Sequence, residues 1–357
     1  MFYPVSVFLS SCAGKASIVC EGPSGSDRRL VVLGMGGTIA GRADDAADLV
    51  GYRAGELSVE QILAGVPVPA GYALEAEQVC QIDSKDLGPV HWQRLVGALT
   101  RQLERVEVSG VVITHGTDTL EETAYLLQRV LSPSKPVVMT AAMRPATALQ
   151  PDGPRNLADA LMTAAQLADA DRSGVVVTMA GKVFAGTELS KQHSHDPDAF
   201  RAGDAGPLAA LEQGQLRPLR AWPANELALG ARVVAVPVPL WPQVEIVLSH
   251  SGANGRVVKL LMTAGVDGLV VAGTGNGTLH ADLEAALLKA DRSGVKVLRS
   301  TRCAAGGVTD PAPASGGADV SQPAGPGPRR LMSAGTLTPV QARIELLLQL
   351  LAKRAKA

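Results

Sequence analysis

Aromatic residues are scarce in this sequence, at 3% of 357 residues, and its basic residues do not alternate with them. The stacking platforms that bind single-stranded nucleic acids are therefore absent. The formal net charge is −1, which gives no general attraction to a polyanion. Because both features of a nucleic-acid-binding surface are missing, we expect no nucleic-acid partner.

Cysteine motifs and long apolar runs are also missing. The cysteines form no CxxC pair and no His/Cys cluster with zinc spacing, so the sequence offers no metal-binding pattern. We expect Cys12, Cys20, Cys80 and Cys303 to be small buried or incidental thiols. No apolar run approaches the roughly 20 residues that a spanning helix needs, so we expect no membrane partner.

Residues 1–27 lack the charged start of a typical export signal. Phe2–Leu9 is apolar, and LSSC at 9–12 resembles a lipoprotein cleavage site, but no positively charged region precedes them. Ser, Gly and Pro are common in the rest of this stretch. We interpret residues 1–27 as a poorly ordered extension and favour a cytoplasmic location, with the periplasm as the alternative.

The pattern that is present is that of a two-domain α/β protein. A composition of 46% hydrophobic and 19% charged residues is typical of a soluble globular chain long enough for two domains. Strands alternate with helices in both halves, which predicts doubly wound, mainly parallel sheets, the larger in the N-terminal domain and a flavodoxin-like one in the smaller C-terminal domain. The predicted boundaries are an extension at 1–27, an N-terminal domain at 28–220, a linker at 221–242 and a C-terminal domain at 243–357.

Short apolar runs predict the strands, and amphipathic spacing predicts the helices between them. In the N-terminal half we expect strands at 30–33, 79–82, 111–114, 136–140 and 175–179, and helices at 91–105 and 155–168. The proline-rich segment 180–242 is expected to be irregular. The C-terminal half contains strand-to-turn units at 244–249 and 269–277, a strand at 295–301, helices at 281–290 and 339–355, and a flexible stretch at 304–328.

A glycine-rich turn follows the first strand and ends on Thr38. Leu30–Leu33 is a short apolar run bounded by glycine, which is typical of a buried strand. The Thr38 hydroxyl is thereby placed at the carboxyl end of a strand, where ligands of open α/β sheets bind. Two other interpretations stay open: a dinucleotide fingerprint, which requires glycine where Ile39 stands, and a plain turn in which Thr38 caps a helix.

A second strand-to-helix turn follows at 111–122. Gly116 ends the strand, and Thr119 and Glu122 have the spacing of a capping box. Thr117 and Asp118 stand at the helix N-terminus, where backbone N–H groups stabilise developing negative charge. Polar residues at this position often do no more than cap the helix.

Both turns carry motifs that resemble the bacterial-type L-asparaginase family. The matching stretches are GGTIAG at 36–41, THGTDT at 114–119, MTAAMRP at 139–145, DGPRNL at 152–157, AGTGNG at 272–277, and the RSTR and SAGTL segments that follow. The resemblance extends over residues 29–355. It implies an amidohydrolase that converts L-asparagine and water to L-aspartate and ammonia, with no metal and no cofactor. It also implies a homotetramer with active sites at subunit interfaces.

The resemblance assigns roles to particular residues. Thr38 is similar to the family's nucleophilic threonine, Tyr52 to its lid tyrosine, and Lys191 to its catalytic lysine. His115 receives no catalytic role, and we expect it to satisfy a local hydrogen bond. The catalytic set is Thr38, Tyr52, Thr117, Asp118 and Lys191, and the substrate-binding set is Gly37, Ser84, Lys85, Gly116, Ala142 and Asn276, the last contributed by a neighbouring subunit.

Elementary chemistry supports these assignments independently. A threonine hydroxyl is a weak nucleophile and needs a nearby base or proton relay, for which Lys191, Asp118 and Thr117 supply the residue types. An amino-acid substrate carries an ammonium and a carboxylate, and Asp118 can bind the ammonium. Backbone N–H groups after Gly116 can bind the oxyanion formed by attack on the side-chain amide.

The sequence departs from the family pattern at two places. Lys85 stands where many members have glutamine, which adds a charge beside the substrate-binding serine. Residues 303–320 contain no glutamate, only Asp310 and Asp319, although members usually supply a glutamate there. A broad-specificity glutaminase-asparaginase that also accepts L-glutamine is therefore an alternative. A catalytically silent amino-acid- or nucleotide-binding protein on the same fold is the other.

Overall fold

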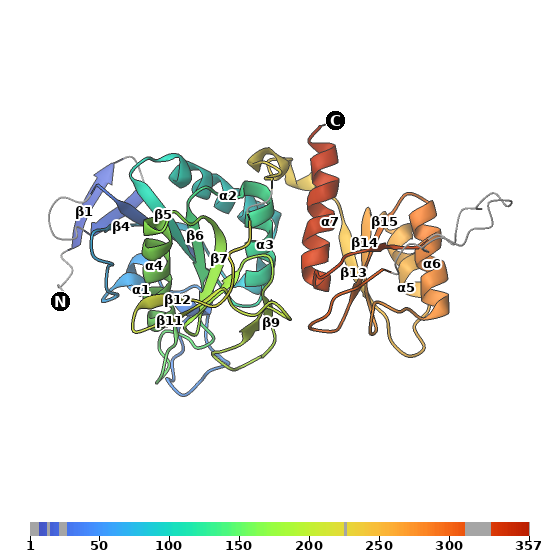
Figure 1. Ribbon diagram of the computed structural model, residues 1–357, viewed down its shortest axis with the longest axis horizontal. Coiled ribbons are helices and arrows are strands. Elements are labelled where there is room, and N and C mark those ends of the chain that lie inside the picture. The colour runs from blue at the N-terminus through green and yellow to red at the C-terminus, as the bar shows by residue number, and fades with distance from the viewer. Residues whose placement is uncertain (1–6, 13–14, 21–26, 225–226, 311–329, 357) are drawn as a thin grey trace. The chain divides into compact units, whose positions relative to one another are not determined.

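Two separate sheets organise the chain in the computed structural model, which describes residues 7–12, 15–20, 27–224, 227–310 and 330–356. The chain divides into unit 1, Met1–Val238, and unit 2, Pro239–Ala357 (Figure 1). Each unit has its own sheet with helices packed on it. The predicted α/β class with a larger and a smaller sheet is confirmed.

The centre of the unit 1 sheet consists of five parallel strands. In spatial order they are β4 (Ala73–Ile82), β3 (Arg29–Gly36), β5 (Val108–Thr114), β6 (Pro136–Thr140) and β7 (Gly174–Met179). Of these five strands, β3 is the first along the chain and lies between the second, β4, and the third, β5, so the winding direction reverses between β3 and β5. Ligands of such sheets bind outside the carboxyl ends of the strands at this switch point.

Within the stretch 1–27, the described residues form strands. β1 (Val7–Cys12) and β2 (Lys15–Cys20) pair antiparallel, and β2 pairs with the edge of β4. The sequence predicts a poorly ordered extension here. The structure instead adds these two strands to the sheet, and the other residues before Asp27 lie outside the described part.

The segment 180–242 extends the opposite edge of the sheet, so the prediction of an irregular segment was wrong for part of it. β8 packs antiparallel on β7, and β11 and β12 follow it outward. The sequence pattern does not predict these strands, because they are short and lie in a proline-rich segment. The elements of the segment are β8 (Lys182–Ala185), β9 (Ser190–Lys191), β10 (Phe200–Arg201), β11 (Ala209–Glu212), β12 (Gln215–Pro218) and the short 3-10 turns η3 (Ala231–Val233) and η4 (Val238–Leu240).

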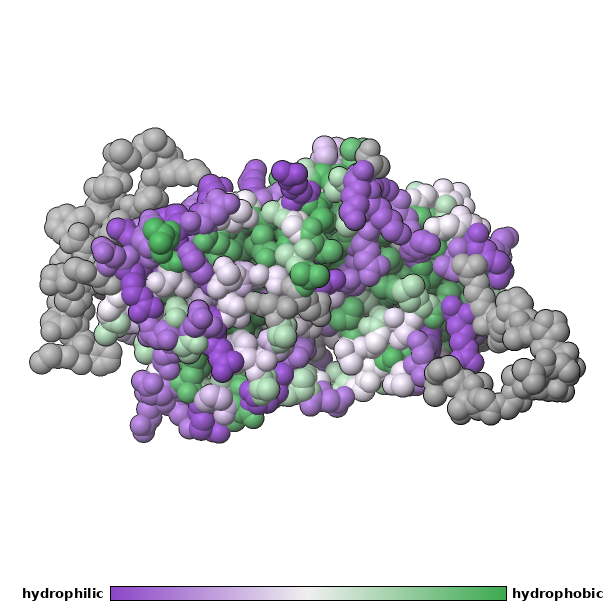
Figure 2. All heavy atoms as spheres, turned by 45° about the horizontal axis from the view of Figure 1, so that its top comes forward, coloured by the Kyte–Doolittle hydropathy of each residue, from purple (hydrophilic) through white to green (hydrophobic). Residues whose placement is uncertain are grey.

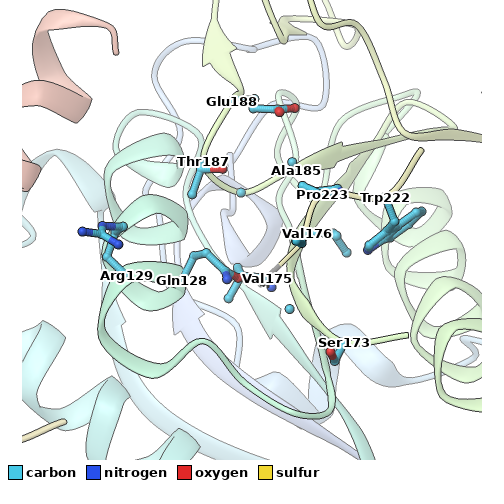
Figure 3. Close-up of a pocket in the computed structure, with 13 residues that line it drawn as sticks. Gln128, Arg129, Ser173, Val175, Val176, Ala185, Thr187, Glu188, Trp222 and Pro223 are labelled. Carbon is cyan, nitrogen blue, oxygen red and sulfur yellow. Dashed lines mark hydrogen bonds between the residues drawn. The ribbon is translucent and has the colours of Figure 1, made fainter. Parts of the chain in front are cut away.

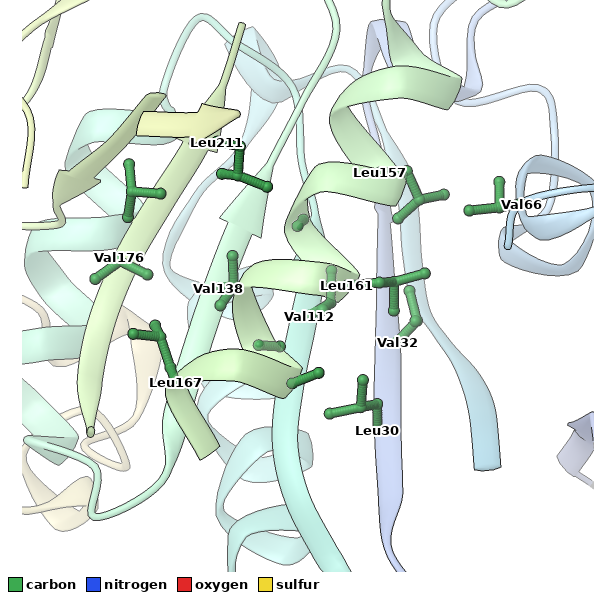
Figure 4. Close-up of a cluster of buried hydrophobic side chains, with 14 of the residues drawn as sticks. Leu30, Val32, Val66, Val112, Val138, Leu157, Leu161, Leu167, Val176 and Leu211 are labelled. Carbon is green, nitrogen blue, oxygen red and sulfur yellow. The ribbon is translucent and has the colours of Figure 1, made fainter. Parts of the chain in front are cut away.

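Helices cover both faces of the unit 1 sheet, which explains the unbroken apolar run of β3. Leu30 and Val32 point toward α4 and its neighbours (Figure 4), while Val31 and Leu33 are equally buried on the other face. Burying one such side chain contributes about 1.5–3 kcal/mol, so the two faces together fix this strand at the centre. The helices are α1 (Val59–Leu63), α2 (Pro89–Glu104), α3 (Leu120–Leu131) and α4 (Gly153–Asp169).

Unit 2 is a smaller parallel sheet with helices on both faces. A separate apolar core lies beneath its first two helices, and the last helix packs against the central strands. The order along the sheet is β13 (Val244–Leu248), β14 (Gly268–Gly273), β15 (Lys296–Thr301) and β16 (Met332–Ser333), with helices α5 (Arg256–Thr263), α6 (Ala281–Arg292) and α7 (Pro339–Arg354).

The surface mixes hydrophilic and apolar side chains. Figure 2 shows apolar groups gathered in patches between hydrophilic ones on one face. In unit 2, large apolar side chains are exposed on β13 and α5, including Leu248 at 51% and Leu260 at 71%. Among the described helices, none combines the length and apolar character needed to cross a bilayer.

Candidate active site

The turn after β3 brings the ends of three strands together. Gly36 and Gly37 have φ angles of +92° and +80°, in the region that favours glycine. A Cβ on Gly36 would lie 2.5 Å from the Ile82 nitrogen, and one on Gly37 would lie 2.5 Å from the Gly116 nitrogen. The two glycines therefore let the end of β3 touch the end of β4 and the segment that follows β5.

Thr38 begins the short 3-10 turn η1 (Thr38–Ala40) and is 7% exposed. The cap position of this turn is occupied by Gly37 and not by Thr38. The Oγ1 atom instead lies 2.7 Å from the phenol oxygen of Tyr52. The hydroxyl is thus directed at another polar group and not at its own backbone, which argues against the plain capping interpretation.

Tyr52 is held close to Thr38 because the two ends of its loop, Arg42 and Arg53, are hydrogen-bonded to each other. Arg42 and Arg53 exchange two backbone hydrogen bonds of 2.9 and 2.8 Å, and the Tyr52 ring packs against Gly41. Burial raises the pKa of the Tyr52 phenol, and the hydrogen bond with Thr38 opposes this shift. The phenol is therefore neutral at physiological pH and is positioned to exchange a proton with the threonine.

A second polar cluster lies at the turn after β5. The Lys191 ammonium, from β9, donates to Thr117 Oγ1 at 2.9 Å and to Asp118 Oδ1 at 2.7 Å. Thr117 is 5% exposed and the Lys191 side chain 19%, whereas the Asp118 carboxylate is half exposed. The structure thus joins a lysine, a hydroxyl and a carboxylate that the sequence separates by more than 70 positions.

The two clusters adjoin at the switch point between β3 and β5. The backbones of Gly37 and Gly116 are in contact, and the charge of Asp118 acts on the Tyr52 phenol. Ser84 lies against the same place, because a Cβ on Gly116 would be 2.4 Å from its hydroxyl. The candidate nucleophile Thr38, the cluster around Lys191 and the hydroxyl of Ser84 therefore lie together at the carboxyl ends of the central strands.

Ser84 and Lys85 belong to the 3-10 turn η2 (Ser84–Asp86) after β4. Ser84 is 3% exposed. The Lys85 ammonium is instead paired with Asp83 at 2.9 Å and Asp86 at 2.7 Å, and these carboxylates raise its pKa. Its side chain is 60% exposed, so its charge is largely directed at its own turn and at solvent.

The expected capping box at the start of α3 is absent, and that expectation was wrong. Thr119 makes no side-chain hydrogen bond to its own helix. Its hydroxyl donates to the Ser84 carbonyl at 2.9 Å. This residue therefore ties the turn after β4 to the turn after β5.

The turn after β6 places Ala142 beside Ile39. Ala142 is fully buried, and both side chains lie against Gly153 at the start of α4. Asp152 accepts from the main-chain N–H groups of Met143 and Arg144, each at 2.9 Å. The DGPRNL segment thus holds the shape of the TAAMRP turn, a role that the sequence alone did not indicate.

Asn276 lies in unit 2, after β14. Its amide is paired with the backbone of Thr309: Nδ2 donates to the carbonyl at 2.9 Å and Oδ1 accepts from the N–H at 2.7 Å. Arg299 of β15 pairs with Asp310 at 2.7 Å, which fixes one of the two acids noted in place of the family glutamate. The other, Asp319, lies outside the described residues.

His115 is fully buried and is bound locally, as expected. Its Nδ1 lies 2.8 Å from the Gly116 carbonyl, so this nitrogen carries the proton and donates. Burial lowers the pKa of the imidazole to about 4, and the hydrogen bond to Gly116 opposes this effect. A neutral ring is the result at physiological pH.

Glu121 is a further polar residue near the site, with no site role predicted from the sequence. It lies on the first turn of α3, and its Oε1 accepts from the Lys191 main-chain N–H at 3.4 Å. Burial raises the pKa of this carboxyl to about 7, the charge of Glu122 adds to the effect, and Lys191 opposes it. In the sequence Glu121 has the spacing of a capping-box acid relative to Asp118, which indicates a helix cap and not a contact with Lys191.

A cavity of about 170 Å³ lies elsewhere in unit 1 (Figure 3). It is lined by the first residues of β7, the end of β8, the last turn of α3 and Trp222, and by none of the candidate site residues. In the described ranges, no three His, Cys, Asp or Glu side chains are grouped so as to hold a metal ion.

The site lies at the switch point of five parallel strands. It contains a buried threonine beside a lysine, a second threonine and a carboxylate. This arrangement is typical of an α/β enzyme with an activated hydroxyl nucleophile. The comparisons specify the family. Residues 29–223 match the model "Asparaginase, N-terminal", and residues 243–357 match "Glutaminase/Asparaginase C-terminal domain". The chain belongs to the asparaginase family.

Relatives cover nearly the whole chain. L-asparaginase 2 of Escherichia coli strain K12 is 36% identical over 90% of this chain and 88% of its own length. A probable periplasmic L-asparaginase of Haemophilus influenzae is 33% identical over the same shares. The crystal structure of a probable cytoplasmic L-asparaginase from Campylobacter jejuni has a TM-score of 0.78 and 32% identity, covering 92% of this chain and 98% of that one.

Proposed function

We propose that the chain is an L-asparaginase that hydrolyses L-asparagine to L-aspartate and ammonia through an ester on Thr38. The observation that carries the proposal is the meeting of two hydroxyl clusters at the β3–β5 switch point: Thr38 with Tyr52, and Lys191 with Thr117 and Asp118. Family membership supports the reaction, and the site supports the residues that perform it.

In the first half-reaction, the Thr38 oxygen forms a bond to the side-chain amide carbon of the substrate. Its proton enters a relay in which the Tyr52 phenol, or Thr117 with the Lys191 ammonium, takes up this proton and releases one of its own for the leaving nitrogen, and the carbonyl oxygen becomes an oxyanion. Backbone N–H groups after Gly116 stabilise that charge, and one such donor is worth about 3 kcal/mol of barrier. The carbon–nitrogen bond then breaks, and the departing nitrogen takes up a proton and leaves as ammonia.

In the second half-reaction, water attacks the ester carbon and gives one proton to the same relay. The bond to Thr38 breaks, its oxygen regains a proton, and L-aspartate is released. The Asp118 carboxylate is half exposed and keeps one oxygen for the substrate ammonium, while Ser84 donates to the substrate carboxylate. Gly37 and Ala142 contribute backbone surface beside them.

Asparagine and glutamine differ by one methylene, a discrimination usually worth only about 1–3 kcal/mol in a pocket. A broad-specificity glutaminase-asparaginase is therefore the second candidate, and the C-terminal match names both activities. Lys85 favours neither substrate, because its ammonium is paired with the acids of its own turn.

We further propose that the active form is a homotetramer in which Asn276 serves the site of a neighbouring subunit. The exposed apolar side chains of β13 and α5 supply surface for such contacts. A cytoplasmic location agrees with the name of the Campylobacter relative, and the Haemophilus relative makes the periplasm the alternative. Light scattering and cell fractionation measure these two properties.

The deciding experiment is ammonia release from L-asparagine, L-glutamine and a no-substrate blank, for the wild type and Thr38→Ala. We expect release from asparagine by the wild type only, with the variant folded to the same degree by circular dichroism. Full activity in Thr38→Ala would remove the nucleophile assignment. A folded wild type that binds but does not hydrolyse either amide would indicate a silent binding protein.

A further inference from the structure

Lys191 stands on a strand that is not part of the ten-stranded sheet. β9 is two residues long and, among the described strands, pairs only with β10. Thr117 and Asp118, by contrast, lie in the turn that follows the central strand β5. The lysine and its two partners therefore lie on separate parts of unit 1. Contacts other than sheet pairing must keep the β9 backbone close to the turn after β5.

Glu121 makes such a connection. Its Oε1 accepts from the main-chain N–H of Lys191 at 3.4 Å, so the lysine contacts the first turn of α3 through its backbone and the residues just before α3 through its ammonium. The neighbouring Leu189 and Phe200 are buried and anchor the β9–β10 hairpin by apolar packing. Apolar packing is non-directional, whereas a hydrogen bond to the N–H fixes the depth and orientation of the chain at Lys191 itself.

Stability alone does not explain a carboxyl group at this place. The Oε2 atom is buried and has no hydrogen-bond partner in the described part of the chain. A buried polar atom without a partner costs free energy, and an apolar side chain of similar size would avoid this cost. The feature that an apolar side chain would lose is the acceptor for Lys191.

We propose that Glu121 is a positioning residue that holds the Lys191 main chain so that its ammonium reaches Thr117 and Asp118 together. This inference rests on the proposed function of that cluster. Burial brings the pKa of Glu121 to about 7, but both the carboxylate and the neutral acid retain an oxygen that accepts from the N–H. The hydrogen bond between the Lys191 N–H and Glu121 is therefore kept on either side of neutral pH.

The test compares Glu121→Gln, which keeps the acceptor and removes the charge, with Glu121→Leu, which removes both. We expect Glu121→Leu to lower kcat roughly 10- to 100-fold, because a displacement of about 1 Å in a catalytic group has effects of that size. KM should change by less than about threefold, since the substrate-binding groups stay in place. Glu121→Gln should keep kcat within about threefold of the wild type.

Glu104→Gln, an exposed carboxylate at the end of α2, is the matched control for the loss of one negative charge. If Glu121→Leu does not fold, Glu121→Met, with a flexible apolar chain of similar length, replaces it. Wild-type kcat in the folded apolar variant would overturn the proposal. Equal loss in Glu121→Gln and the apolar variant would also overturn it, because the charge and not the acceptor would then matter.

A second readout is independent of activity. The rate of labelling of Lys191 by trinitrobenzenesulfonate, followed by mass spectrometry, is compared with that of Lys182 in the same sample. Because the Lys191 side chain is 19% exposed, we expect Glu121→Leu to increase its relative rate and Glu121→Gln to leave it unchanged. An unchanged rate in both variants refutes the role proposed for this hydrogen bond. If the wild type hydrolyses no amide, the proposed function fails, while the labelling result still decides the role of Glu121.

Discussion

Replacing Lys191 by methionine removes the ammonium group at the centre of the second cluster and keeps most of the side-chain volume. The variant leaves Thr117 Oγ1 and Asp118 Oδ1 without the donor that lies 2.9 and 2.7 Å from them. If Lys191 moves protons for Thr38, the variant should lose much of its kcat and little of its free energy of unfolding. The expected sizes of these two losses differ enough to be distinguished.

The effect on stability is expected to be small. Asp118 is half exposed, so water replaces its lost partner, and ion pairs of this kind contribute about 0–1 kcal/mol. The effect on catalysis is expected to be large, because general acid–base groups typically contribute about 10²- to 10⁴-fold. At about 1.36 kcal/mol for each tenfold change, that is roughly 3–5 kcal/mol of barrier.

The assay is ammonia release from L-asparagine at several concentrations, with urea unfolding of the same preparations. Lys182→Met is the control, because Lys182 forms a comparable ion pair with Asp198 at 2.6 Å on β8, outside the cluster. We expect the control to show a similar change in unfolding free energy and an almost unchanged kcat. Wild-type kcat in Lys191→Met, or equal losses in both variants, would refute the reasoning.

Three further outcomes are expected. Tyr52→Phe removes a hydroxyl that lies 2.7 Å from the Thr38 oxygen, so kcat in the ammonia assay should fall by roughly 10²-fold while urea unfolding changes by only about 1 kcal/mol; undiminished turnover would exclude the phenol from the relay. Gly37→Ala and Gly65→Ala both place a Cβ on a residue with φ +80°, which costs about 1–3 kcal/mol, but of the two only Gly37 has backbone atoms 2.5 Å from the new Cβ. Urea titrations should therefore show the larger loss for Gly37→Ala, and equal losses would contradict the close approach. Burial lowers the pKa of His115 from 6.5 to about 4, so between these pH values the unfolded chain binds a proton that the folded chain does not. The stability present above pH 6.5 should therefore fall by roughly 3 kcal/mol as the pH drops toward 4. His115→Asn should lose this dependence in pH-dependent unfolding, and an identical profile in the variant would argue against a neutral buried ring.

Several elements could be predicted from local pattern. The apolar run Leu30–Leu33 lies on a strand buried on both faces, as its lack of alternation indicates. Helix α7 was expected at 339–355 and is found at Pro339–Arg354, because its capping Thr338 and the proline at its start are strong local signals. Such features depend on neighbours in the chain, which the sequence displays directly.

Other elements depend on partners far away in the chain. β8, β11 and β12 are short and lie in a proline-rich segment, so their pairing becomes evident only where β7 offers an open edge. The hydroxyl of Thr119 has the spacing of a helix cap, but the Ser84 carbonyl lies within its reach and binds it instead. In both cases a tertiary contact outweighs the local pattern.

The sequence by itself determined where strands end in glycine and threonine, and its motifs indicated the family, because these depend on backbone sterics and on residue identity at fixed spacing. Only the tertiary structure decided that the ends of β3 and β5 are adjacent, that Tyr52 lies over Thr38, and that Lys191 reaches Thr117 and Asp118. Strand order and loop closure follow from burial of the whole sheet, which no short stretch encodes. The role proposed for Glu121 belongs to this second kind, since one hydrogen bond across 70 positions in the chain carries it.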